Sequence, residues 1–173
     1  MATKTYTNSV GSKVGAGGNI QFTINGDASD PIPLDATIDG IVLDLRIAVR
    51  PGGPAVSEVL CNVQDDHNGG SFSTVNRTSS TGPFVAFPSA AVETFGGSTD
   101  LFGLTSWTAE SFNNNATAAT FTVRLTHNGS SDVLYADGTQ SVTIHFTEAA
   151  ATAAGTVTLT SGTVTLTSGM ITL

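Results

Sequence analysis

The chain has 173 residues, of which 39% are hydrophobic and only 12% charged, and it contains 19 glycines and one cysteine. This length suffices for one domain with its own core, and a single cysteine excludes a disulfide within the chain. The net charge of −8, without clustered Lys or Arg, disfavours nucleic acid as a partner, since phosphate binding needs basic patches.

The apolar runs are too short to cross a bilayer, so we expect no membrane partner. The first six residues lack the apolar stretch of a signal peptide, and we therefore expect synthesis and folding in the cytoplasm. Such a low charged fraction is also typical of a surface that other subunits cover.

Residues 1–18 predict an N-terminal strand or arm, because the strand-like stretch Lys4–Val10 is followed by several glycines. Asn19–Ile24 alternates apolar and polar residues and ends at Asn25-Gly26, a turn signal. Thr37–Val49 is the strongest candidate for a central strand, since its apolar residues recur at every second position.

Further strands are predicted downstream, and the clearest helical signal is one short turn at Trp107–Phe112, where Thr108 is placed to cap it. The predicted strands are Ser57–Gln64, Ser71–Asn76, Phe84–Phe87, Thr120–Thr126 and Gln140–Thr147, with a further short segment at Asp132–Tyr135. Many strands without alternating helices predict an all-β fold, an antiparallel β-sandwich or jelly roll over residues 19–150.

Residues 151–173 form a threonine-rich tail in which a seven-residue unit is repeated. Thr156–Gly162 and Thr163–Gly169 have the same sequence, and each alternates threonine with apolar residues, as a half-buried strand does. Seven is odd, so an unbroken strand would turn Val157 and Val164 to opposite faces. Either the Ser-Gly pairs form turns or bulges that reset the face, or both faces are covered.

Such a tail is suited to pairing its backbone with a neighbouring chain. We therefore predict an extended C-terminal β tail that makes intermolecular contacts, with the N-terminal arm as a second contact element. The residues predicted to make these contacts are Thr156, Val157, Leu159, Val164, Leu166, Ile171, Leu173, Lys4 and Tyr6.

Three stretches of the chain follow a recognisable pattern. Ile38–Arg46 is similar to an opening strand "I-x-G-I-x-V-x-I". Phe95–Gly103, followed by Ser106–Asn113, is similar to "Y-G-G-S-x-D-L-W-G … W-T-x-x-D-I-N". Thr120–Leu125 and Gln140–Thr147 resemble "F-x-V-x-L" and a final "V-x-I-T-V-Y-Y-T" strand. Together they resemble a β-sandwich, jelly-roll-like module of tailed-bacteriophage virion structural proteins of the decoration or fibre type.

The resemblance covers residues 36–148 and departs from the pattern at Phe102, Glu110 and His145-Phe146, where residue type and period are kept. It implies a structural virion protein without enzymatic activity or cofactor. The expected role is a capsid decoration or cement protein on the capsid exterior, forming a homo-oligomer, a trimer, that binds the major capsid protein. The alternative is a tail-fibre, head-fibre or baseplate component that binds host glycans. A secreted carbohydrate-binding module or a surface pilin is a further alternative of a different class.

Asp65-Asp66-His67-Asn68-Gly69-Gly70 is the densest group of metal-ligand types, and its oxygens suit Ca²⁺. It lacks the spaced acidic residues of a calcium-binding loop, however, and Asp, Asn and Gly are common in ordinary turns. His67, His127 and His145 lie on separate segments, which disfavours a zinc or catalytic trio. We therefore assign no metal site.

The remaining candidates also favour structural roles. Cys61 shares an apolar strand face with Val59 and Val63, which predicts a buried, inert thiol. Dispersed carboxylates around Trp107 give weak support for a glycosidase pair, and the neighbouring aromatics predict a plug at one end of the sandwich rather than a sugar platform. The carboxylates are Glu93, Asp100 and Glu110, and the aromatics are Phe95, Phe102 and Phe112.

Overall fold

A computed structural model of the chain describes residues 1–15, 19–27, 29–49, 59–67, 69–79, 90–113, 121–127 and 134–150. Its elements are eight strands and one short helix: β1 Ala2–Gly15, β2 Asn19–Ile24, β3 Thr37–Val49, β4 Val59–Asp65, β5 Arg77–Ser79, β6 Ala91–Gly97, α1 Glu110–Asn113, β7 Phe121–His127 and β8 Leu134–Thr147. Among these residues no helix is long and apolar enough to cross a bilayer.

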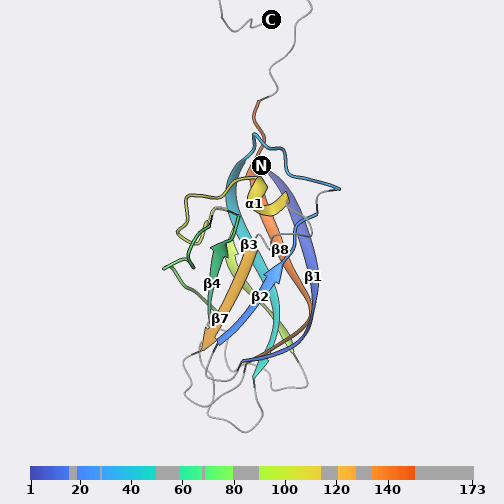
Figure 1. The fold of residues 1–173 in the computed structure, drawn as a ribbon, viewed down its shortest axis with the longest axis vertical. Coiled ribbons are helices and arrows are strands. Elements are labelled where there is room, and N and C mark those ends of the chain that lie inside the picture. Colours follow the sequence, from blue (N-terminus) through green and yellow to red (C-terminus); the bar gives the residue numbers. More distant parts are fainter. Residues whose placement is uncertain are drawn as a thin grey trace, which may run out of the picture.

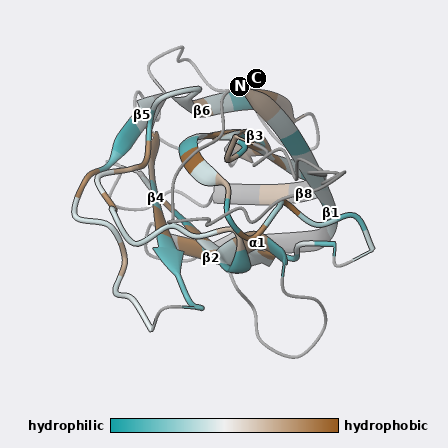
Figure 2. Ribbon diagram, turned by 90° about the horizontal axis from the view of Figure 1, so that it is seen from above, coloured by the Kyte–Doolittle hydropathy of each residue, from teal (hydrophilic) through white to brown (hydrophobic). Residues whose placement is uncertain are grey.

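The strands form two four-stranded sheets that pack face to face (Figures 1 and 2). The first sheet has the order β1-β8-β3-β6 and the second β2-β7-β4-β5, and every recorded strand pair is antiparallel. Successive strands mostly change sheet, which produces the eight-stranded jelly-roll order. The predicted antiparallel β-sandwich is confirmed.

Apolar residues at alternate strand positions fill the space between the sheets. On β3, Ile41, Leu43 and Leu45 are fully buried, while the intervening Val42 and Asp44 are only partly buried. The same alternation on β7 and β8 buries Phe121, Val123, Leu125, Val142, Ile144 and Phe146. Burial of apolar surface at this period is what selects the strand register, because a shift by one residue would expose the whole set.

The two lateral sides of the sandwich are each closed by a polar contact between the sheets. On one side the side-chain amide of Asn8 on β1 donates to the carbonyl of Thr23 on β2, at 2.9 Å. On the other side Arg77 on β5 donates two hydrogen bonds to Asp100, just after β6. Lys4 on edge strand β1 faces the gap between the sheets, and such an inward charge discourages pairing with further strands.

The N-terminal segment, for which the sequence predicts a strand or an arm, forms a strand of the sandwich. Residues 2–15 form β1, which pairs with β8 from Ala2↔Phe146 to Gly15↔Leu134, with a register shift between Val10 and Lys13. Residues 2–15 therefore belong to the first sheet. The threonine-rich tail at 151–173 and the predicted strand at 84–87 lie outside the described residues.

Two strand predictions in the middle of the chain require correction. Residues 71–76 are not a strand, and the strand β5 follows them at Arg77. The hydroxyl of Ser73 bonds to the backbone of Val75 and of Phe102, and such local bonds compete with a sheet ladder. Residues 91–97, to which the sequence assigned no strand, form the edge strand β6.

Candidate functional site

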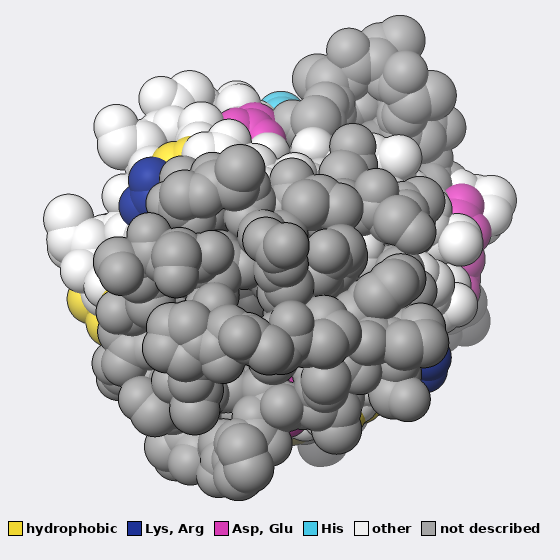
Figure 3. Space-filling view, turned by 90° about the horizontal axis from the view of Figure 1, so that it is seen from below, with side chains coloured by type: hydrophobic (Ala, Val, Ile, Leu, Met, Phe, Trp, Pro, Cys, Tyr) yellow, Lys and Arg dark blue, Asp and Glu magenta, His cyan; other side chains and the backbone are white. Residues whose placement is uncertain are grey.

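One end of the sandwich gathers the features that the sequence associates with assembly. Met1 lies there, β3 begins there and β8 ends there, so that the chain enters and leaves the domain at the same place (Figure 1). We call this the terminal end; it also carries the loop 25–36, the loop 101–109 and α1. From the opposite end, the described acidic and basic side chains are seen as separate spots at the periphery (Figure 3).

The loop 25–36 is held against α1 by Asn113. The side-chain amide of Asn113 donates to the carbonyl of Ile32 at 2.6 Å, and its oxygen accepts from the Ile32 N–H at 2.7 Å. Ile32 itself is buried in the core. Gly26 lies so close to the carbonyl of Phe112 that a Cβ atom would overlap it, which explains a glycine at this position. The loop is therefore a fixed part of the terminal end.

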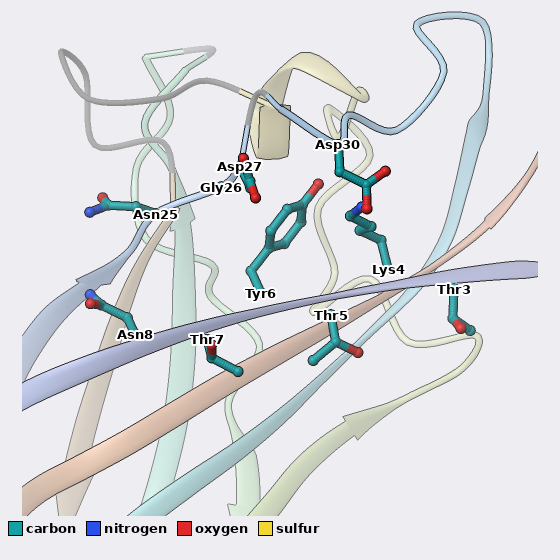
Figure 4. Close-up of a pocket in the computed structure, with 10 residues that line it drawn as sticks. All are labelled: Thr3, Lys4, Thr5, Tyr6, Thr7, Asn8, Asn25, Gly26, Asp27 and Asp30. Carbon is teal, nitrogen blue, oxygen red and sulfur yellow. The ribbon is translucent and has the colours of Figure 1, made fainter.

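A polar groove of about 550 Å³ lies between β1 and this loop (Figure 4). Its lining residues are Thr3, Lys4, Thr5, Tyr6, Thr7, Asn8, Asn25, Gly26, Asp27 and Asp30. Lys4 forms an ion pair with Asp30, and the Tyr6 hydroxyl donates a long hydrogen bond of 3.5 Å to Asn113. Burial, together with the negative charge of Asp27, raises the pKa of Tyr6 to about 12. Tyr6 is thus a neutral core residue at neutral pH.

A second pocket of about 400 Å³ opens at the same end, and we call it the Trp107 pocket. It is lined by Leu34, Asp35, Ala36, Thr37, Ile38, Leu101, Thr105, Trp107 and Thr108. The indole N–H of Trp107 donates to the carbonyl of Leu101 at 3.0 Å, which fixes the ring at the floor. Leu34 is 72% exposed, whereas Ile38 is only 6% exposed. The pocket thus combines an apolar floor with threonines and one carboxylate.

The aromatic residues near the pocket belong to the core. Trp107 is stacked on Phe112 with ring centroids 5.2 Å apart, and Phe121 lies 5.6 Å from Trp107. Trp107 is 8% exposed, and Phe95, Phe102 and Phe112 are more deeply buried. The rings close one end of the sandwich, as the plug interpretation predicted, and they do not form an open sugar-binding platform.

No protein-family model and no curated protein matches the sequence. Among solved structures, the chain is similar to the CBM22-1 xylan-binding domain of Paenibacillus barcinonensis Xyn10C, with 11% identity over 84% of this chain and 88% of that one, and a TM-score of 0.35. The CBM22-1–GH10 modules of Clostridium thermocellum Xyn10B in complex with xylohexaose give 13% identity over 79% of this chain and 25% of that one, with a TM-score of 0.34.

A chain of the cyanophage Pam1 capsid asymmetric unit gives 21% identity over 80% of this chain and 85% of that one, with a TM-score of 0.23. All three TM-scores are below 0.5. These likenesses therefore carry no argument about the role of this chain, which has to be made from its own residues.

The acidic turn after β4 is engaged in structural hydrogen bonds. Asp65 is fully buried, and its carboxylate accepts from the hydroxyls of Ser111 at 3.1 Å and Ser106 at 3.4 Å. Asp66 accepts from the Thr122 hydroxyl at 2.5 Å. Within the described ranges no group of three or more His, Cys, Asp or Glu side chains is placed to hold a metal ion. The turn interpretation is the one that this geometry supports.

The Gly-Gly-Ser-Thr-Asp stretch at residues 96–100, which belongs to the second of the three stretches described above, also has a structural function. Asp100 bonds to Arg77 and accepts from the Phe102 N–H at 2.8 Å, and Phe102 adopts a positive φ of 53°. Burial alone would raise the pKa of Asp100, but the hydrogen bonds from Arg77 and Phe102 outweigh it and hold the pKa below its usual range. The motif fastens the end of β6 to β5.

The other candidate catalytic and metal-binding residues lie apart or have structural partners. Cys61 is fully buried, and burial raises the pKa of its thiol, as expected of an inert cysteine. At the surface, the Nε2 atom of His67 lies 3.3 Å from the Oε2 atom of Glu110. His127 is at the end of β7 and His145 is on β8, in the other sheet. Glu93 lies on β6, whereas Glu110 lies on α1.

The residues predicted to make intermolecular contacts are only partly placed by the structure. Lys4 and Tyr6 lie on β1 with their side chains in the polar groove, directed at groups of the same chain. An intermolecular role for them remains a prediction. The remaining seven, Thr156, Val157, Leu159, Val164, Leu166, Ile171 and Leu173, lie outside the described residues.

Sequence reasoning missed the Trp107 pocket. Leu34 lies in a proline-rich loop that has no periodic pattern, so its position beside Trp107 could not be inferred from spacing. Ile32 lies in the same loop, so an apolar side chain there did not by itself distinguish Leu34.

Proposed function

We propose that this chain is a structural virion protein of a tailed bacteriophage that decorates and stabilises the outer surface of the capsid as a trimer. The protein acts without catalysis or cofactor, by burying surface across neighbouring capsid subunits, so that expansion or internal pressure must break those contacts. The jelly roll alone does not decide this, because the same fold serves capsids, lectins and cupins.

One observation carries the proposal: residues 2–147 already supply all eight strands of the jelly roll. The repeated units from Thr156 onward, whose sequence is typical of strands, come after these eight strands in the chain and lie outside the described residues. Residues 149–173 contain no Asp, Glu, Lys or Arg, which leaves them without the charges that keep a strand from associating. An uncharged sequence of this kind is suited to pairing with another polypeptide.

The way in which the sandwich is closed supports the tail as the strand donor in such pairing. The two sides of the sandwich are fastened by Asn8–Thr23 and Arg77–Asp100, and β1 carries the inward-facing Lys4. The sandwich edges are therefore poor acceptors of further strands. In the proposed function the tail is the donor, and a capsid subunit or another copy of this chain provides the acceptor.

Imaging of the native particle tests the proposal. Decoration predicts many copies in a regular array over the head, whereas a fibre or baseplate component would be found in few copies at one vertex or on the tail. A companion experiment deletes residues 151–173 and measures binding to particles that lack the protein. The proposal predicts loss of binding while the far-ultraviolet circular dichroism of the sandwich is kept. Undiminished binding would contradict it.

A further inference from the structure

The terminal end carries large apolar side chains that are exposed. Three large hydrophobic side chains are recorded as exposed among the described residues, and two of them are at this end: Met1 at 72% and Leu34 at 72%. The third, Val92, is 59% exposed on β6. Leu34 borders the Trp107 pocket, so this apolar surface leads into a cavity of about 400 Å³. An exposed apolar patch beside a pocket is typical of an interaction site.

Strand β8, which precedes the tail, ends at the rim of this pocket. Thr37 and Ile38, which line the pocket, pair with Thr147 and Phe146 at the end of β8. Residues 148–150 are exposed and lead away from the sandwich (Figure 1). The eight residues 148–155 span at most about 29 Å when extended, so the repeats start within reach of this end of an adjoining molecule.

The chemistry of the pocket matches the composition of the repeats. Its floor is apolar, formed by Trp107, Leu101 and Ile38, and its other lining residues include Thr37, Thr105 and Thr108. The repeats offer valine and leucine at alternate positions with threonine between them. An inserted Val or Leu would bury its side chain on the floor, while the neighbouring threonine hydroxyls meet the hydroxyls of the pocket.

We propose that the Trp107 pocket receives the Val-Thr-Leu segment of the tail of a second copy of this chain. Each copy carries both the pocket and the root of the tail at one end, so copies that meet by these ends can exchange tails and close a cyclic assembly. The exposed residues after β8 lead outward, toward such a partner. This inference rests on the proposed function, because it names the partner of the tail and the place where it docks.

The test compares three full-length variants with the wild type by sedimentation velocity over a range of concentrations. Leu34→Asp places a charge at the pocket rim without disturbing the core, since Leu34 is 72% exposed. The double variant Leu159→Asp, Leu166→Asp alters the tail. Val92→Asp is the matched control, an exposed apolar residue on β6. We expect loss of the oligomer in the first two variants and an unchanged oligomer in the control.

Trp107 is the only tryptophan of the chain and reports directly on the pocket. In the wild type, quenching of its fluorescence by acrylamide should increase on dilution, as the partner's tail leaves. In the tail variant the quenching should not depend on concentration and should equal that of the diluted wild type. Protection by the tail that does not depend on concentration would overturn the inference, because the tail would then occupy the pocket of its own chain.

The outcomes also separate this inference from the proposed function. If Leu34→Asp assembles like the wild type while the tail variant does not, the pocket is not the docking site, and the intermolecular role of the tail stands. If the tail variant itself assembles like the wild type, this inference fails, and the proposed function then stands or falls with the binding of the variant lacking residues 151–173 to particles.

Discussion

Thr37, the first residue of β3, pairs with Thr147, the last residue of β8. The pairing joins the rim of the Trp107 pocket to the point where the chain leaves the sandwich. The exposed Leu34, the pocket and the root of the threonine-rich tail consequently lie at the same end of the domain. The structural contacts that close the sandwich can be tested separately from this end.

The ion pair between Arg77 and Asp100 should contribute measurably to stability. Asp100→Ala removes two hydrogen bonds from Arg77 and one from the Phe102 N–H, and we expect a loss of roughly 1–3 kcal/mol in the free energy of unfolding. Asp44→Ala, which removes an exposed carboxylate bonded to Thr94, should change it by less than about 0.5 kcal/mol. Urea unfolding measures both. Equal effects would contradict the structural importance of the Gly-Gly-Ser-Thr-Asp stretch.

The Arg77–Asp100 pair also predicts that the stability of the fold decreases at acidic pH. The pKa of Asp100 is lower in the folded chain than in the unfolded chain, so its contribution is fully present above the unfolded pKa of about 3.9. It is lost as the pH falls from there through the folded pKa. The stability of Asp100→Asn should therefore decline less steeply below about pH 4 than that of the wild type. Parallel declines would contradict this assignment.

The raised pKa of Tyr6 predicts that the stability of the fold decreases at alkaline pH. Its pKa rises from 10.0 to about 12 on folding, so the stability that it contributes is present below pH 10 and is lost as the pH rises through about 12. In Tyr6→Phe this part of the alkaline slope should be absent. At neutral pH the substitution should cost under about 1 kcal/mol, because the bond to Asn113 is long at 3.5 Å. An unchanged slope in Tyr6→Phe would refute the prediction.

Two glycines with positive φ should differ in their tolerance of alanine. Gly69 has φ +65° with open space around it, so Gly69→Ala should cost about 1–2 kcal/mol through backbone strain alone. Gly96 has φ +84°, and a Cβ there would overlap the carbonyl of Ile41, so Gly96→Ala should cost more. Thermal unfolding compares the two variants. Equal midpoints would mean that β6 does not approach β3 as closely as described.

Calcium should not stabilise the protein. The carboxylates of Asp65 and Asp66 already accept hydrogen bonds from Ser106, Ser111 and Thr122. We therefore expect the same unfolding temperature with Ca²⁺ and with a chelator, and a loss of roughly 1–3 kcal/mol in Asp65→Ala, because the buried carboxylate that accepts these hydrogen bonds is removed. A rise in unfolding temperature with Ca²⁺ would show binding to the folded state and restore the metal-site interpretation.

The strands with clean alternation were predicted best from sequence. The bounds of β2 and β3 agree with the prediction, because each is half-buried and its apolar face determines the register. The edge strand β6 was missed because Glu93 shares its inward face with Phe95, which obscures the pattern. The strand order depends on contacts distant in sequence, and no local pattern encodes them.

Candidate sites could be predicted from the sequence where all of their functional side chains come from one segment of the chain. The turn around Asp65, the buried thiol of Cys61 and the aromatic plug at Trp107 agree with their sequence interpretation. The Trp107 pocket was not predictable, because it arises where the loop containing Leu34 meets the loop 101–108. Such a site exists only once the sandwich has brought these loops together.

The most direct test of the tail's intermolecular role is the sedimentation behaviour of the full chain beside its Leu159→Asp, Leu166→Asp variant. We predict a trimer for the wild type and a monomer for the variant, with the same circular dichroism for both. A variant that sediments as the wild type does would contradict the proposal that the threonine-rich tail joins one copy to another.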